Sequence, residues 1–386
     1  MLLNNYSAPN FDWSENPTSV QPRADLWAIF NGMGFSKEIT ASLISSGYVV
    51  SEYSPVIIDR FHGGPSMSSD GSTRFSTDSF KKVIDEGGFM NSPFPVHRAK
   101  SEQDVREFVK KIQTKFPTKQ LCFRGQTSHY TLNREVKNPK LNHPDLGETS
   151  LVPSVWRHML NSTLNVFPEF VGIPLLFWSS ILYKMWPMDE IHSREKALQT
   201  KGEWLYTASD MEDCSDELLR AFGKFRLDLL VDEAVFQTGL LTMMQHYGLP
   251  TPFLDLTSEL DVAIFFATHK FGFDNTHAAY DFAGTNGQQS IIYVLSLREV
   301  DMHTNERNRV MQMAKPERPR RQSCVVCSTN AWSINLPADY IVGAILMDYE
   351  MTQAGRYGTP DLFPSPDDDP FLKAWMSTGE YPLTVF

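Results

Sequence analysis

Cysteine is scarce in this chain of 386 residues, which contains only four. The sole close pair is Cys324 and Cys327, separated by two valines. A disulfide framework needs more cysteines at regular spacing, so we expect reduced thiols and a cytoplasmic location. A lone C-x-x-C pair also lacks the second pair or the histidines that zinc requires, so we expect no metal. The valines between the two cysteines favour a strand.

Long hydrophobic runs and the common catalytic motifs are absent too. The longest apolar run, residues 171–183, is shorter than the roughly 20 residues of a membrane-spanning helix, and we interpret it as a buried helix. The first residues lack the basic region and apolar core of a signal peptide. No phosphate-binding P-loop, serine-hydrolase elbow or H-E-x-x-H motif occurs in the sequence. We therefore expect no membrane partner, and these three enzyme classes are unsupported.

Positive charge is in deficit, with 35 lysines and arginines against 46 acids and a net charge of −11. An acidic surface repels nucleic-acid phosphates, which disfavours a general nucleic-acid coat and leaves only a local basic groove as an option. Residues 315–321 contain four basic side chains. This group indicates either an anion contact or a solvated basic loop. The acidic run at residues 367–369 is typical of a surface turn.

The hydrophobic content of 41%, with 26 phenylalanines, is enough for a sizeable core. Apolar spacing and turn residues predict helices, strands and one long loop or linker at residues 62–92. The predicted helices span residues 24–50 in two pieces, 213–246 and 258–270, with further helix starts at 101 and near 151–157. The predicted strands span residues 120–124, 290–297 and 341–347.

Helices and strands do not strictly alternate, which predicts an α+β fold with a small antiparallel or mixed sheet rather than a doubly wound one. Residues 1–95 are predicted to form an N-terminal extension with short helices and a Gly/Ser-rich linker. Residues 96–386 are predicted to form the main domain.

Two polar segments lie at the ends of apolar stretches of the chain. In the first, a predicted strand ends on Arg124 and Gly125. An arginine is a fixed cation whose planar fork suits phosphate or carboxylate, and glycine lets a ligand approach the backbone. Gln126 and Tyr130 add polar and aromatic groups nearby. The alternative is that Arg124 pairs with a buried acid such as Asp255 and serves only the fold.

The second segment contains Gln245, His246 and Tyr247 at a predicted helix end, where an imidazole and a phenol could polarise or stack on a ligand. The alternative for His246 is a structural histidine with both ring nitrogens satisfied. Gly248 suits the position just after a helix. We expect Asp255 to lie just before the next helix.

These segments and several further blocks in the same order resemble the FRG domain, named after the Phe-Arg-Gly tripeptide found here at residues 123–125. The resemblance covers residues 97–370. Pro252, Leu256 and Cys324 stand where the family usually has Arg, Trp and Gly, which raises the alternative of an altered or inactive member. The supporting blocks are the helix from Ser101, Phe123–Gln126, Pro153–Ser154 with Arg157, Gln245–Thr251, Leu254–Asp255, Phe265–Ala267, Arg318 with Gln322, and Leu362–Pro364.

The Arg-Gly pair also resembles the start of the Arg-dependent ADP-ribosyltransferases at the level of fold and residue order. That resemblance implies NAD as substrate, with Arg124 on the ribose–phosphate side and Gly125 at the nicotinamide amide. Tyr247 or Tyr130 would stack on nicotinamide, and Gln322 would orient the ribose 2′-OH. The predicted catalytic residues are Arg124, Tyr247, Gln322 and His246, and the predicted NAD-binding residues are Arg124, Gly125, Gln126, Tyr130, Gln245, Asp255 and Arg318.

The leading hypothesis is a protein that binds NAD, cleaves its glycosidic bond and passes ADP-ribose to water or to a protein or nucleic-acid target. A toxin or phage-defence effector is the setting that we expect for such an activity. The rival hypothesis is a non-enzymatic nucleotide- or protein-binding module in which Arg124, Asp255 and Arg318 form a structural ion network. A third hypothesis is a nucleic-acid-acting effector that uses residues 315–321.

Overall fold

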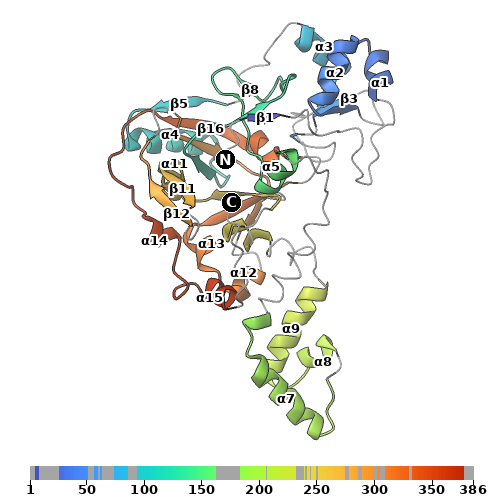
Figure 1. Ribbon diagram of the computed structural model, residues 1–386, viewed down its shortest axis with the longest axis vertical. Coiled ribbons are helices and arrows are strands. Elements are labelled where there is room, and N and C mark those ends of the chain that lie inside the picture. Colours follow the sequence, from blue (N-terminus) through green and yellow to red (C-terminus); the bar gives the residue numbers. More distant parts are fainter. Residues whose placement is uncertain are drawn as a thin grey trace. The chain divides into compact units, whose positions relative to one another are not determined.

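The computed structural model describes residues 5–7, 26–50, 56–59, 61–62, 74–85, 94–161, 183–205, 207–231, 239, 241–243, 245–248, 251–273, 278–285, 289–299, 302–304, 309–329 and 333–377 (Figure 1). The chain divides into two compact units. Unit 1 comprises Met1–Val166, Pro250–Met302 and Val325–Thr359, and unit 2 comprises Phe167–Leu249, His303–Cys324 and Pro360–Phe386. The buried helix predicted for residues 171–183 falls almost entirely outside the described residues.

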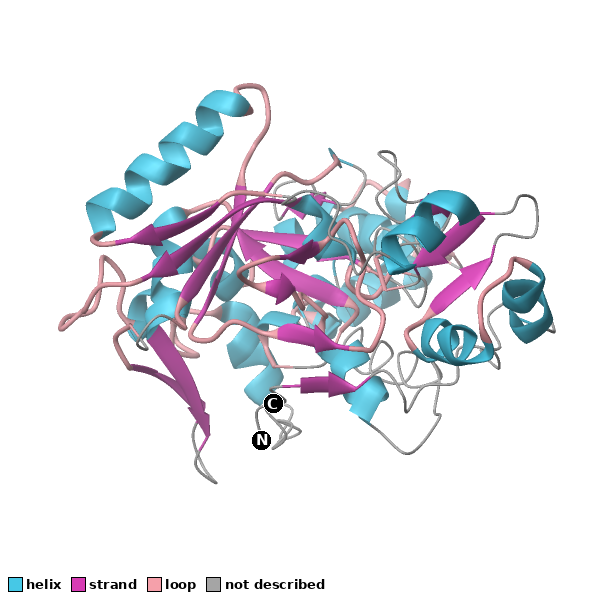
Figure 2. Cartoon of the chain, turned by 90° about the horizontal axis from the view of Figure 1, so that it is seen from above, coloured by secondary structure: helices cyan, strands magenta, loops and turns pink. Residues whose placement is uncertain are grey.

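The largest sheet has seven strands, in the order β14-β15-β10-β6-β13-β16-β5. Figure 2 shows the strands of the chain in magenta and the helices in cyan. β6 pairs antiparallel with both β10 and β13, β13 pairs antiparallel with β16, and β5 runs parallel to β16. The predicted α+β fold with a mixed sheet is therefore confirmed. Along the sheet the strands are Met302–Thr304, Cys324–Ser328, Phe253–Thr257, Cys122–Gln126, Ile291–Leu295, Ile341–Met347 and Val96–Ala99.

Two strands of this sheet differ from the sequence prediction. β6 runs from Cys122 to Gln126, so Arg124 lies in the middle of a strand and not at its end. The strand continues because Gly125 and Gln126 stay paired with β13. β10 is a strand that the sequence analysis does not predict, and Asp255, expected just before a helix, lies in its middle. Its Leu254 and Leu256 are buried in the core, and this burial outweighs the local turn signals.

Side chains of the sheet alternate between two buried faces. On β13, Ile291, Tyr293 and Leu295 pack into one core cluster, while Ile292 and Val294 pack into the other. The second face is covered by α4 (Glu102–Lys115) and α11 (Leu260–Thr268), which contribute buried apolar side chains to the same cluster. α4 begins at Ser101, as predicted, because the Ser101 side chain accepts a hydrogen bond of 3.2 Å from the Asp104 N–H.

The described residues between 26 and 85, in unit 1, form a smaller cluster of helices and strands. Helices α1 (Leu26–Gly32) and α2 (Lys37–Ser45) confirm the two predicted pieces. A three-stranded antiparallel sheet follows, made of β2 (Tyr48–Val50), β3 (Val56–Asp59) and β4 (Arg74–Ser76). The loop prediction for residues 62–92 was wrong over residues 74–85, which hold β4 and α3 (Thr77–Asp85).

Phe80 of α3 explains that error, since its side chain is fully buried against Tyr48 and Phe35. The domain boundary near residue 95 stays a prediction. The other elements of unit 1 are β1 (Asn5–Ser7), β7 (Thr131–Asn133), β8 (Asn142–His143), β9 (Gly147–Glu148), α5 (Ser154–Asn161), β11 (His269–Phe273), β12 (Ala278–Phe282) and η4 (Leu336–Tyr340).

Unit 2 is largely helical in its described part. Its core contains Phe222, Met243, Tyr247, Phe371 and Trp375, all buried. The helix predicted for residues 213–246 is confirmed over α9 (Glu217–Val231) and again at residues 245–246. None of the helices in the described ranges combines the length and apolar character that a membrane crossing requires. The other helices are α7 (Met188–Thr200), α8 (Ala208–Glu212), α12 (Arg309–Ala314), α13 (Glu317–Arg321) and α15 (Pro370–Met376), with the short α14 (Thr359–Leu362) starting at the last residue of unit 1.

Candidate functional site

The predicted site residues fall into two groups, one in each unit. In unit 1, Arg124 lies opposite Tyr293 of β13, so both side chains leave the same face of the sheet. The Arg124 Nη1 donates a hydrogen bond of 2.8 Å to the main-chain oxygen of Asp255. The proposed pairing with the Asp255 carboxylate is therefore replaced by a bond to a neutral carbonyl.

Arg124 keeps a positive charge that no acid of the described residues neutralises. No acid in the described ranges forms an ion pair with it. Its Nε is buried and lacks a hydrogen-bond partner among these residues, and the same holds for Oε1 of Gln126. Gln126 stands two residues further along β6, on the same face. A buried donor and a buried acceptor without partners are unusual and indicate that this face accommodates another polar group.

Gly125 faces the opposite side, toward α11. A Cβ at this position would lie 1.8 Å from the main-chain oxygen of Ala263 and 2.9 Å from the Ala267 nitrogen. The absence of a side chain therefore lets β6 and α11 pack in direct contact. Packing accounts for this glycine, and the predicted contact of its backbone with NAD stays a prediction.

Tyr293 and His129 form a polar pair beside Arg124 that the sequence analysis missed. The main-chain oxygen of Leu146 accepts a hydrogen bond of 2.7 Å from the His129 Nε2, so Nδ1 is left to accept one from the Tyr293 hydroxyl. Burial lowers the pKa of His129 and raises the pKa of Tyr293. Tyr130 raises the pKa of Tyr293 further, and Arg124 lowers it. The available signal was one tyrosine inside the apolar run at residues 291–295.

In unit 2, His246 makes hydrogen bonds through both ring nitrogens. Its Nδ1 lies 3.1 Å from Oε1 of Gln322, and its Nε2 lies 2.7 Å from Sγ of Cys324. Gln322 is in turn held by Leu362, whose main-chain oxygen accepts a hydrogen bond of 3.1 Å from the amide nitrogen. The structure thus brings together His246 and Gln322, two of the predicted catalytic residues, and adds Cys324.

Tyr247, also predicted to be catalytic, is part of the unit 2 core, with 1% of its surface exposed. Its hydroxyl donates a hydrogen bond to the buried carboxylate of Asp369. Burial first, and then the Asp369 charge, raises the pKa of Tyr247. The ring contacts Phe371 at 5.0 Å and the edge of Trp375 at 6.1 Å between centroids. Stacking of nicotinamide on Tyr247 stays a prediction, although protein groups already surround the ring.

The surface turn predicted at residues 367–369 is confirmed for Asp367 and Asp368, which are exposed in a turn, and wrong for Asp369. Asp369 is fully buried and forms the N-terminal cap of α15, where its carboxylate accepts a hydrogen bond of 3.1 Å from the Leu372 N–H. Gly248 confirms the expected position after a helix, with a φ of 91°. The main-chain oxygen of Gln245 accepts a hydrogen bond of 3.2 Å from this glycine, so Gln245 forms part of the helix end.

The basic group at residues 315–321 forms the short helix α13 and the turn before it. Arg320 and Arg321 both pair with Glu317 on the same helix, and Lys315 is exposed. Arg318 differs, because its guanidinium lies 4.8 Å from the ring centroid of Tyr247 and 5.8 Å from that of Phe363. Its Nε is buried and has no hydrogen-bond partner within the described ranges.

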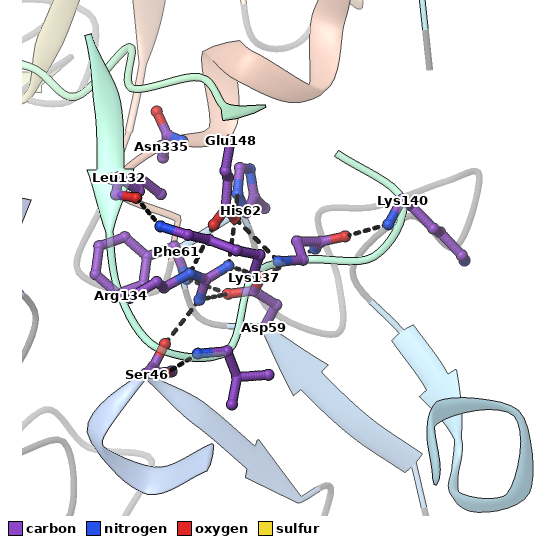
Figure 3. Close-up of polar contacts among 12 residues, drawn as sticks. Ser46, Asp59, Phe61, His62, Leu132, Arg134, Lys137, Lys140, Glu148 and Asn335 are labelled. Atoms are coloured by element: carbon purple, nitrogen blue, oxygen red, sulfur yellow. Dashed lines mark hydrogen bonds and ion pairs between the residues drawn. The ribbon is translucent and has the colours of Figure 1, made fainter. Parts of the chain in front are cut away.

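A buried ion cluster in unit 1 has no counterpart in the sequence analysis (Figure 3). Arg134 lies at its centre, with 1% of the side chain exposed, and pairs with the carboxylates of Asp59 and Glu148. It also donates a hydrogen bond of 2.7 Å to the main-chain oxygen of Ser46. Nε2 of His62 makes a hydrogen bond of 2.9 Å with Glu148, and its Nδ1 lies at an ion-pair distance of 2.8 Å from the Asp339 carboxylate.

The charges of this cluster complement one another. Burial alone lowers the pKa of His62, but Asp339 and Glu148 outweigh it and raise the pKa to about 10. Burial raises the pKa of Glu148, but Arg134 and His62 hold it at about 2. Asp59, His62 and Glu148 are close enough to share a cation. The guanidinium of Arg134 already occupies this position, so the arrangement is an ion network.

Comparison with known proteins gives one match. The family model of the FRG domain matches residues 189–275, a narrower span than the 97–370 expected from the ordered motifs. No curated protein and no solved structure matches the chain. The matched span contains Gln245, His246, Tyr247 and Asp255, whereas Arg124, Arg318 and Gln322 lie outside it. The match supports assignment of this chain to the FRG family, with the FRG domain at residues 189–275.

Proposed function

We propose that this FRG-domain protein binds NAD on the Arg124 face of β6 and cleaves the bond between nicotinamide and ribose. The observation that carries the proposal is the charge of Arg124, which is bonded to a neutral carbonyl and to no acid of the described chain. A cation held in this way attracts a phosphate or pyrophosphate group, and the planar guanidinium suits two oxygens at once.

The neighbouring groups suit the rest of a nucleotide. The buried Oε1 of Gln126 can accept a hydrogen bond from an amide N–H or a ribose hydroxyl, both of which NAD contains. Tyr130, predicted to bind NAD, is partly buried and lies close enough to Tyr293 to affect its pKa. These residues belong to the same unit and to the same stretch of chain or its paired strand.

The proposed reaction breaks the C1′–N bond of NAD heterolytically. The electron pair moves to the pyridinium nitrogen, which yields neutral nicotinamide, and positive charge develops on the ribose. Water or an acceptor nucleophile then forms a bond to C1′ and releases a proton. Arg124 contributes by fixing the phosphate side, so that the site is arranged before charge develops.

The decisive experiment incubates the purified full chain with NAD and follows nicotinamide by mass-resolved chromatography. Arg124→Ala is expected to lower the release about a hundredfold, as for loss of one charged contact to a reacting ligand. Arg98→Ala is the matched control, because Arg98 is an exposed arginine on β5 of the same sheet. Failure of the native chain to bind or consume NAD would exclude the proposal.

A nucleotide-binding module without turnover is the second candidate. It is favoured by Tyr247, which is enclosed in the unit 2 core, and by Gln322, whose amide is bonded at both ends. In this case NAD would raise the unfolding temperature without nicotinamide release. Saturation at about 100 times the dissociation constant adds about 2.7 kcal/mol to the free energy of unfolding. Salt-sensitive binding to DNA or RNA would instead favour a nucleic-acid effector.

A toxin or phage-defence role is the setting that we propose for NAD cleavage. Expression of the native chain in bacteria should then slow growth and lower cellular NAD, while Arg124→Ala should do neither at the same protein level. Slowed growth with unchanged NAD would separate the toxicity from the proposed reaction.

A further inference from the structure

Cys324, His246 and Gln322 are joined by consecutive hydrogen bonds within unit 2. They come from three different elements: His246 from a helix end, Gln322 from the cap of α13, and Cys324 from the start of β15. Ser323, between Gln322 and Cys324, has a φ of 46°. This left-handed conformation is uncommon for a residue other than glycine, and such strained residues are concentrated at functional sites.

The direction of every bond in this group follows from one neutral acceptor. The main-chain oxygen of Leu362 can only accept, so the nitrogen of the Gln322 amide must face it. The amide oxygen therefore faces His246, whose Nδ1 must carry the proton. This tautomer leaves a lone pair on Nε2, which lies 2.7 Å from the Cys324 sulfur and is placed to accept the thiol proton.

This arrangement matches what nucleophilic catalysis by cysteine requires. A thiol is activated when an adjacent base takes its proton, and the base is held in the correct tautomer by a third group. We propose that Cys324 is a catalytic nucleophile toward acyl substrates, with His246 as its base and Gln322 as the residue that positions His246. The proposal goes beyond NAD cleavage and does not rest on it, because the new bond forms at a carbonyl carbon.

The other cysteines lack this environment in the described structure. Cys327 is three residues further along β15 and therefore leaves the opposite face of the strand, where it is buried in the apolar core. This geometry separates Cys324 from Cys327 despite the C-x-x-C spacing. Burial raises the pKa of the Cys122 thiol to about 12. Cys214 is partly buried, and its sulfur lies 3.4 Å from the main-chain oxygen of Asp216.

The proposed reaction has two balanced halves. First, Nε2 of His246 takes the thiol proton, the Cys324 sulfur attacks the carbonyl carbon, and the leaving alcohol takes that proton as its bond to carbon breaks. The acyl group is then a thioester on Cys324. Next, water attacks the thioester and gives a proton to Nε2. The carbon–sulfur bond breaks, and the returned proton restores the thiol while the carboxylic acid is released.

The native full chain tests the nucleophile without any variant. We would treat it with iodoacetamide at about pH 6.5, below the ordinary thiol pKa of about 8.5, and follow each cysteine by peptide mass spectrometry. Cys324 is buried, with 4% of its surface exposed, whereas Cys214 is partly buried. Because His246 is placed to take its proton, Cys324 should nevertheless react at least about tenfold faster than Cys214. A rate no higher than that of Cys122 or Cys327 would overturn the proposal.

The substrate class is tested with p-nitrophenyl acetate on the same protein. We expect a burst of p-nitrophenol and an acetyl group on Cys324, and neither in Cys324→Ser. Cys214→Ser is the matched control and should retain the burst. Rapid alkylation without acetylation of Cys324 would overturn the acyl-transfer assignment.

The roles of His246 and Gln322 are distinguished by measuring how the alkylation rate of Cys324 depends on pH. His246→Asn should abolish the fast reaction at about pH 6.5 and leave the rise expected of an ordinary thiol near pH 8.5. Gln322→Ala should shift the profile toward that of an ordinary thiol. An unchanged profile in Gln322→Ala, with the fold intact, would contradict the positioning role.

Discussion

Arg134 and Arg124 are both arginines of unit 1, but their surroundings differ. Arg134 meets two carboxylates, a main-chain oxygen and the rings of Tyr48 and Phe61, so its donors are fully used inside the fold. Arg124 meets one neutral carbonyl and keeps a buried Nε without a partner in the described structure. The comparison teaches that the partners of an arginine, more than its burial, distinguish a structural charge from one available to a ligand.

The largest expected effect comes from removing the paired arginine. Arg134→Ala leaves the carboxylates of Asp59 and Glu148 buried without their cation. The free energy of unfolding should fall by about 3–5 kcal/mol, measured by urea denaturation at neutral pH. Arg98→Ala, at an exposed position, should stay within about 0.5 kcal/mol of the parent chain. Equal losses of unfolding free energy in both variants would show that the ion pairs of Arg134 do not stabilise the fold.

The next effect should come from the charge of His62, which belongs to the same buried ion cluster as Arg134. Burial lowers its pKa, but Asp339, Glu148 and Asp59 outweigh the burial and raise the pKa from 6.5 to about 10. Because the folded protein binds the His62 proton more tightly, its stabilising contribution is fully present below about pH 6.5. It is lost progressively as the pH rises from about 6.5 toward 10.

This loss is measured as the difference in unfolding free energy between the native chain and His62→Gln across that pH range. Other groups titrate in both proteins and cancel in the difference. A difference that does not change between about pH 6.5 and 10 would show that His62 is neutral in the folded protein.

Gly125→Ala tests whether the neighbour of Arg124 serves packing. The added Cβ would clash with the Ala263 main-chain oxygen, so β6 or α11 must shift. The free energy of unfolding should fall by about 2 kcal/mol. Gly355→Ala is the matched control, because a Cβ there meets only the Ile264 side chain at 3.7 Å. A stable Gly125→Ala protein that loses NAD binding would assign this glycine to the ligand instead.

The smallest stability effect is expected for Arg124→Ala. Among the described residues, the variant loses the hydrogen bond to the Asp255 main-chain oxygen, which should cost about 1 kcal/mol of unfolding free energy. Calorimetry with NAD should show a much larger loss of affinity, about tenfold or more, for one charge-assisted contact to phosphate. A loss of stability as large as that of Arg134→Ala would place Arg124 among the structural charges.

Several elements could be read from the chain alone because their signals are local. The helix after Ser101 shows a cap followed by apolar residues at helical spacing, and the strand at residues 341–347 is a continuous apolar run; both occur where predicted. β10 was missed because Asp255 interrupts the apolar run. Its strand form depends on burial of Leu254 and Leu256, which no local pattern reveals.

The candidate site also has some features that the sequence shows and others that only the fold decides. The sequence by itself determined the α+β class, the Phe-Arg-Gly tripeptide and the choice of His246 and Gln322, since residue type and order are visible without a fold. Only the tertiary structure decided that Gly125 packs on α11, that Cys324 joins His246, and that Arg134 meets Asp59 and Glu148. The physical reason is that hydrogen-bond partners and burial depend on residues far apart in the chain, such as Arg124 and Asp255, which are 131 positions apart. Periodicity and caps act within a few residues.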